Sequence, residues 1–111
     1  MNRRCLLLIS GLLLFTTKTL AADTNFWIFL CFGQSNMEGF PGIEAMDREP
    51  ADPRFRVLAA VDFPKLERRK GEWYPAVPPL CRPSSGLSPA DYFGRTLVSN
   101  LPPAIRIGVV N

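Results

Sequence analysis

The sequence contains no histidine among its 111 residues. Histidine is the general base of the usual Ser-His-Asp triad, so this chain by itself does not complete that arrangement. Cysteine is also scarce, with three in the whole chain, and neither Cys31 nor Cys81 has the spacing of a metal site. The cysteines therefore predict no metal centre.

Residues 1–22 have the pattern of a secretory signal peptide. Two arginines form a positive start, an apolar stretch covers 5–15, and small residues at 19–22 offer a cleavage site. The apolar stretch is too short to span a bilayer as a mature helix. We expect cleavage after Ala21 or Ala22 and a secreted or periplasmic protein without a membrane anchor. An uncleaved N-terminal anchor is the alternative.

The chain has little net charge once this leader is set aside. It holds 13 Lys and Arg against 10 Asp and Glu, and Arg3, Arg4 and Lys18 lie in the leader, which has no acidic residue. The remaining chain is formally neutral, so its charge does not predict nucleic acid as a partner. The basic cluster at 68–70 is flanked by acidic residues and is typical of a solvated turn.

The two cysteines that follow the leader have two interpretations. Export permits a disulfide between them. Cys31, however, lies inside an apolar run, where cysteine behaves as a small buried hydrophobic residue. The sequence leaves open whether Cys31 and Cys81 pair.

Three apolar segments predict β-strands, at 26–32, 55–61 and 105–110. The first has seven apolar residues with no alternation, which is typical of a strand covered on both faces in a parallel sheet. The segments at 40–54 and 62–87 are rich in proline and predict loops.

A helix is predicted to begin after Ser88. Ser88 is the N-cap, Pro89 is the first helical residue, and Asp91 is placed to return a hydrogen bond to the cap. The apolar face of this helix consists of Phe93, Leu97, Val98 and Leu101. The order strand, loop, strand, loop, helix, strand predicts an α/β fold with a doubly wound, mainly parallel sheet. Ligands of such sheets bind beyond the carboxyl ends of the strands.

Ser35 lies just past the first predicted strand, in the sequence Gly33-Gln34-Ser35-Asn36. A serine hydroxyl is a weak nucleophile that needs an exposed, fixed position, and a tight turn after a buried strand supplies one. The backbone amides that follow, including that of Ser35, are placed to hold an oxyanion at a helix start. A serine that merely caps a helix has the same pattern, so these residues alone leave both interpretations open.

The longer motif Gly-Gln-Ser-Asn-Met-Glu-Gly at 33–39 resembles the nucleophile block of the sialate O-acetylesterase and acetylxylan esterase family. Members of that family are serine esterases of the SGNH type. The segments 71–80, 86–93 and 107–111 are similar to its Trp-containing segment, its second block and the strand before its third block. The resemblance implies a flavodoxin-like topology, with residues 23–111 as the N-terminal part of the esterase domain, truncated after the third strand.

The resemblance also assigns roles to individual residues. Ser35 matches the nucleophile, and its amide matches one oxyanion donor. Gly86 matches a second donor, beside Ser88, which replaces another glycine of that block. Gln34 and Asn36 match residues that brace the loop. The family's catalytic histidine and aspartate are missing from this chain, and the family implies neither a metal nor an organic cofactor.

The implied reaction is the removal of acetyl groups from sugars such as sialic acid or xylan, so an acetylated carbohydrate is the expected partner. Two other interpretations stay open. A non-catalytic carbohydrate-binding remnant would use Trp73 and Tyr74 as stacking surfaces for sugars, although these rings equally suit a role in pinning the loop to the core. A truncated product without a function of its own would also explain the missing histidine.

Overall fold

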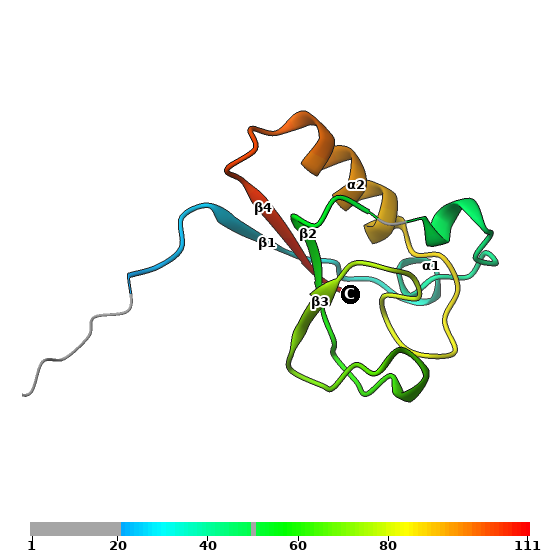
Figure 1. Ribbon diagram of the computed structural model, residues 1–111. Helices are drawn as coiled ribbons and strands as arrows, with labels where there is room; N and C mark the ends of the chain where they lie inside the picture. The colour runs from blue at the N-terminus through cyan, green and yellow to red at the C-terminus, as the bar shows by residue number, and fades with distance from the viewer. Residues whose placement is uncertain (1–20, 50) are drawn as a thin grey trace, which may run out of the picture.

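The computed structural model describes residues 21–49 and 51–111. The signal peptide predicted over 1–22 therefore lies outside the described residues, apart from its last two alanines. Within the described ranges, four strands, two α-helices and two 3-10 turns are connected by long loops (Figure 1). Their bounds are β1 (Phe26–Leu30), α1 (Ser35–Glu38), η1 (Met46–Arg48), β2 (Phe55–Leu58), η2 (Pro64–Leu66), β3 (Trp73–Pro75), α2 (Pro89–Asn100) and β4 (Arg106–Val110).

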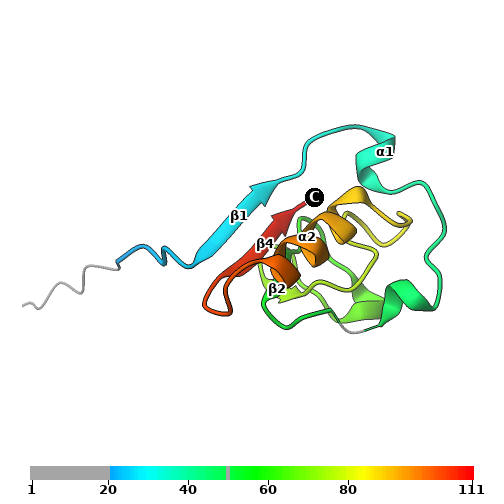
Figure 2. The ribbon, with the colours of Figure 1, turned by 90° about the horizontal axis from the view of Figure 1, so that it is seen from above.

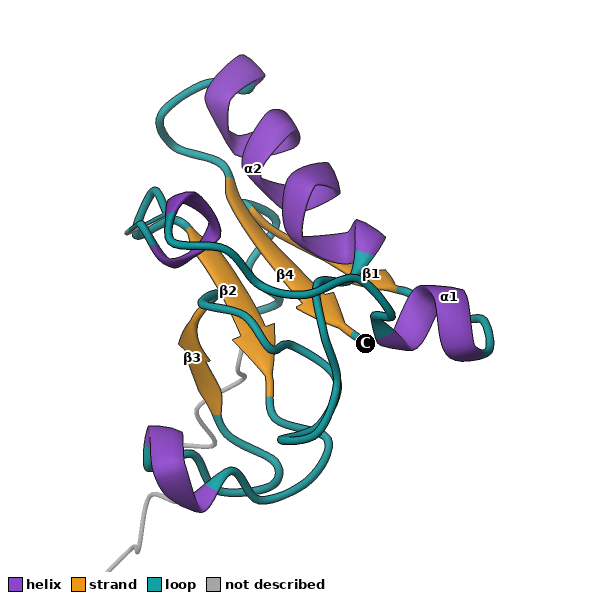
Figure 3. Cartoon of the chain, turned by 90° about the vertical axis from the view of Figure 1, so that its right-hand side faces the viewer, coloured by secondary structure: helices purple, strands orange, loops and turns teal. Residues whose placement is uncertain are grey.

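The strands form one sheet in the order β1-β4-β2-β3. β4 is parallel to both of its neighbours, with Ile107 opposite Trp27 on β1 and opposite Phe55 on β2. β3 is antiparallel to β2. Because β1, β4 and β2 run in one direction, their carboxyl ends lie at the same edge of the sheet (Figure 3).

The expected doubly wound, flavodoxin-like sheet truncated after its third strand is not what the structure contains. A doubly wound sheet has a crossover between successive parallel strands, whereas β3 is a fourth strand that returns antiparallel to β2. The chain reverses through η2 and two residues in the left-handed region, Glu67 (φ 53°) and Gly71 (φ 86°). The prolines of this stretch disfavour a long helix, so a hairpin forms instead, and the result is a four-stranded mixed sheet with few helices.

Helix α2 covers one face of the sheet, and the core lies between them (Figures 2 and 3). Gly94 permits the close packing, because a Cβ at that position would lie 2.0 Å from the Phe55 ring. No helix in the described residues is long and apolar enough to cross a membrane. The buried core cluster consists of Phe55, Val57, Ala76, Leu80, Ala90, Val98, Ile107 and Val109.

The start of α2 confirms one part of the sequence prediction and corrects another. Ser88 is the N-cap, and its side-chain oxygen accepts a hydrogen bond from the Ala90 amide at 3.1 Å. The Asp91 carboxylate does not return a bond to the cap. It accepts one from Arg95 instead, one turn further along the helix, at 2.5 Å.

β1 is an edge strand, and the expectation that both of its faces are covered is wrong. Among the described residues it pairs with β4 alone. The Phe29 ring meets Phe93 of α2 edge-on at 5.1 Å between centroids, so the face bearing Phe29 is partly covered. Alternation along the strand places Ile28 and Leu30 on the opposite face, where they are 52% and 59% exposed.

Candidate functional site

Ser35 is the first residue of α1, five residues beyond the end of β1. Its side chain is exposed to solvent. Gly33 permits the turn between the two elements, because a Cβ there would lie 2.5 Å from the Cβ of Met37. The first amides of a helix have no carbonyl in a preceding turn to bind, so the amides of Ser35 and Asn36 are directed out of the helix end. This is the position predicted for the nucleophile.

Ser35 lines a pocket of about 370 Å³ at the carboxyl edge of the sheet. The pairing of β1 with β4 continues past both strands, with the Cys31 amide donating to the Val110 carbonyl at 2.8 Å. This pairing brings Asn111, which follows β4, to the same pocket. The lining residues are Cys31, Gly33, Gln34, Ser35, Met37, Glu38, Cys81 and Asn111.

Asn111 was not identified as a site residue from the sequence. Its side-chain oxygen and nitrogen are both buried, and neither has a hydrogen-bond partner among the described residues. A buried amide without partners is costly, so a ligand in the pocket that bonds to it gains from satisfying it. Its position in the sequence could have identified it, since a polar residue directly after an apolar parallel strand lies at the edge of the sheet where ligands bind.

Glu38 is the acidic residue of this pocket. Its carboxylate accepts a hydrogen bond from the Arg82 guanidinium at 2.5 Å, which links α1 to the loop before α2. The two side chains are separated by 44 positions in the chain, so the sequence gives no local signal of their contact. The pair fixes Glu38 at the last position of the helix that begins with Ser35.

Cys31 and Cys81 line the pocket together, and both are free thiols. Burial raises the pKa of each thiol above its ordinary value, and the nearby Glu38 carboxylate raises the pKa of Cys81 further. Both groups are therefore neutral at neutral pH. The structure contains no bond between them, although it brings them to one pocket.

The other predicted site residues belong to a contact between two loops. The Gly86 amide donates to the Gly39 carbonyl at 2.7 Å, and the Leu87 amide donates to the Pro41 carbonyl at 2.8 Å. Both glycines are needed for this approach, because a Cβ at Gly86 would lie 2.0 Å from the Pro41 oxygen. The Gly86 amide is thus occupied, and its predicted role as an oxyanion donor requires that bond to open.

Ser88 is also occupied. Its buried hydroxyl donates to the Met37 carbonyl at 2.7 Å while it accepts the bond from Ala90. Ser88 therefore ties the end of α1 to the start of α2, a role that its position as helix cap alone did not reveal.

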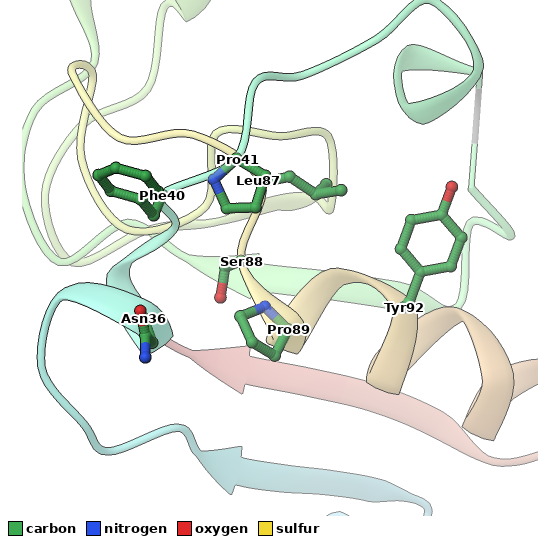
Figure 4. Close-up of a pocket in the computed structure, with 7 residues that line it drawn as sticks. All are labelled: Asn36, Phe40, Pro41, Leu87, Ser88, Pro89 and Tyr92. Carbon is green, nitrogen blue, oxygen red and sulfur yellow. The ribbon is translucent and has the colours of Figure 1, made fainter.

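A second pocket, of about 360 Å³, is lined by residues of α1, of the segment that follows it and of the start of α2 (Figure 4). Four of the five predicted site residues line these pockets: Gln34 and Ser35 line the first, and Asn36 and Ser88 line the second. Gly86 lines neither. The second pocket is completed by Phe40, Pro41, Leu87, Pro89 and Tyr92.

The aromatic pair suggested as a sugar platform makes internal contacts. The Trp73 ring meets Phe26 edge-on at 5.0 Å between centroids. The Tyr74 hydroxyl donates to Glu72 and accepts from the Arg69 amide, each at 2.8 Å. Both rings are half-buried, so these contacts favour the role of anchoring the loop.

The described residues contain no group of three or more Cys, Asp or Glu side chains arranged to hold a metal ion. No model of a known protein family matches the chain. No solved structure matches it either.

Proposed function

We propose that this protein is a serine esterase that removes O-acetyl groups from carbohydrates, with Ser35 as the nucleophile. The observation that carries the proposal is the position of Ser35, exposed at the start of a helix and lining a pocket at the carboxyl edge of parallel strands. Hydrolases need this combination of access and fixed placement for a serine nucleophile. We further propose that the protein is exported, because residues 1–22 have the pattern of a signal peptide.

In the proposed reaction, the Ser35 hydroxyl oxygen attacks the carbonyl carbon of the acetyl ester. The bond from that carbon to the sugar oxygen breaks, and the sugar leaves as an alcohol with the proton that Ser35 gives up. Water then hydrolyses acetyl-Ser35 to acetate and regenerates the hydroxyl. We assign the developing oxyanion to two donors of this pocket, the Ser35 amide and the unpartnered Asn111 side-chain amide.

Removal of the proton from the Ser35 hydroxyl lacks its usual general base, because the chain contains no histidine. Glu38 is acidic and close, but its carboxylate is engaged by Arg82. We therefore expect slow turnover by the chain alone and a faster reaction when a base is supplied from outside it.

The experiment follows the hydrolysis of p-nitrophenyl acetate by the full chain and by Ser35→Ala, each with and without added imidazole. We expect imidazole to raise the rate of the unmodified protein above the sum of the separate rates of protein and imidazole. Ser35→Ala should show only that sum, because imidazole then has no hydroxyl to deprotonate. Equal rates for the two proteins at every imidazole concentration would contradict the proposal.

A second candidate function is carbohydrate binding without hydrolysis. The lack of histidine favours it, and so does the exposed aromatic ring of Phe40 at the second pocket. Under this alternative, Ser35→Ala binds glycans as tightly as the unmodified protein, and neither protein releases acetate from an acetylated glycan.

A further inference from the structure

The second pocket has two aromatic side chains on its walls (Figure 4). Phe40 is 84% exposed and Tyr92, on the first turns of α2, is 45% exposed. Large aromatic surfaces left in water at the rim of a pocket are characteristic of ligand-binding sites. The volume of about 360 Å³ lies within the range of small-molecule pockets.

The Tyr92 ring is held in place before any ligand binds. Its hydroxyl donates to the Asp47 carboxylate at 2.8 Å. Asp47 is itself fixed, since its other oxygen accepts from the Glu44 amide at 2.8 Å and its carbonyl accepts from Arg95 at 2.7 Å. A ring fixed in this way loses little conformational freedom on binding, which favours affinity.

In the part of the chain that the structure describes, no charged side chain lines the pocket. The Arg95 guanidinium lies 5.8 Å from the centroid of the Tyr92 ring and is paired with the buried Asp91 carboxylate. An anionic ligand would therefore find no free cation in the lining and would meet the Asp47 carboxylate behind Tyr92. The pocket instead offers aromatic surface, proline and leucine, with the Asn36 amide as an exposed polar group.

We propose that this pocket is a subsite for a neutral pyranose ring. The apolar faces of a pyranose suit the aromatic walls, and its hydroxyls suit the Asn36 amide. Asn36 directly follows Ser35 in α1, so a sugar bound here lies beside the nucleophile's pocket. A role of this subsite in positioning a substrate for Ser35 rests on the proposed esterase function. The binding of a sugar to the pocket does not depend on that function. The same reasoning predicts a preference for neutral sugars over anionic sugars such as sialic acid.

The test is a titration of the full chain, followed by NMR or calorimetry, with xylotetraose as a neutral probe and N-acetylneuraminic acid as an anionic one. We expect xylotetraose to bind and Phe40→Ala to weaken its binding about five- to tenfold, by loss of the aromatic surface. Phe32→Ala is the matched control. Phe32 is likewise 81% exposed but is not part of this pocket, so its removal should leave the affinity unchanged.

Tyr92→Ala is a second variant on the opposite wall and should also weaken binding. The subsite is refuted if xylotetraose does not bind, if Phe40→Ala and Phe32→Ala behave alike, or if N-acetylneuraminic acid binds more tightly. Hydrolysis of p-nitrophenyl acetate separates this proposal from the esterase proposal, because that small ester does not need the subsite. Phe32→Ala should keep the imidazole-assisted rate of the unmodified protein, whereas Ser35→Ala should lose that rate and still bind xylotetraose, because Ser35 does not line this pocket.

Discussion

Asp47 joins the loop before β2 to helix α2, because its buried carboxylate accepts bonds from the Glu44 amide and the Tyr92 hydroxyl. These two bonds, the amide first, hold the pKa of Asp47 below its ordinary value of 3.8. A carboxyl whose pKa is lowered by folding stabilises the protein fully above its unfolded pKa, and this stabilisation is lost as the pH falls through the folded pKa.

Asp47→Asn should therefore lower the free energy of unfolding at neutral pH. The difference in this free energy between the two proteins should shrink as the pH falls below 3.8. The measurement is urea denaturation of both proteins across that acid range. The raised pKa of the buried Asp91 acts in the opposite direction. Its main cause, burial, is common to both proteins, whereas the smaller part that comes from the Asp47 charge is lost in Asp47→Asn. A stability difference that does not change with pH would contradict this account of Asp47.

Ser88 stabilises more than the start of its own helix, because its hydroxyl also bonds to α1. Ser88→Ala removes both the cap of α2 and the bond to the Met37 carbonyl. We expect a loss of about 1–2 kcal/mol in the free energy of unfolding, measured by urea denaturation. Ser99→Ala, at an exposed position on the same helix, should cost much less, and an equal cost for the two changes would show that the link to α1 is unimportant.

At the scale of the elements, the packing of α2 on the sheet depends on Gly94. A methyl group at this position would lie 2.0 Å from the Phe55 ring, which is itself fully buried. Gly94→Ala should destabilise the protein by about 1–3 kcal/mol through overpacking. Gly42→Ala is the control, since nothing lies within 4 Å of the added atom. Thermal unfolding that fails to separate the two variants would refute this packing argument.

The elements also show what sequence reasoning could reach. The start of α2 was predictable because Ser88 and Pro89 are local signals. β3 was not, because its three residues end at a proline and pair with β2 only at the edge of the sheet. The prediction of a solvated turn at 68–70 is wrong for Arg68, which is buried, for a similar reason. Its partners are the carbonyls of 75, 77 and 79, which the fold rather than the local sequence brings to it.

In the candidate site, too, some residues could be identified from local sequence signals and others could not. Ser35 could be predicted because its strand, turn and helix are contiguous. Asn111 and the pair of Glu38 with Arg82 could not, because parallel pairing and loop packing bring them together from distant parts of the chain. The second pocket depends on α2 lying beside α1, which the sequence pattern did not specify.

At the scale of the whole molecule, β1 presents an apolar edge and face. Trp27, Ile28 and Leu30 are all more than 40% exposed, and unpaired apolar edge strands promote association. Leu30→Lys should raise solubility and reduce self-association, measured by sedimentation velocity over a range of protein concentrations. Leu66→Lys, at a 40% exposed leucine in η2, should have little effect. Equal behaviour of the two variants would show that the β1 edge does not drive association.

The central claim is that Ser35 forms a covalent acetyl intermediate, and mass spectrometry of the protein after brief exposure to p-nitrophenyl acetate tests it most directly. In the full chain with its leader retained, trypsin cleaves after Lys18 and Arg48 and releases Ser35 in the peptide 19–48, which contains no lysine, so non-specific lysine acetylation does not interfere. We predict one acetyl group on that peptide, assigned by fragmentation to Ser35 and missing from Ser35→Ala. Acetylation confined to lysine-containing peptides, or to Cys31 within 19–48, would contradict the role of Ser35 as the nucleophile.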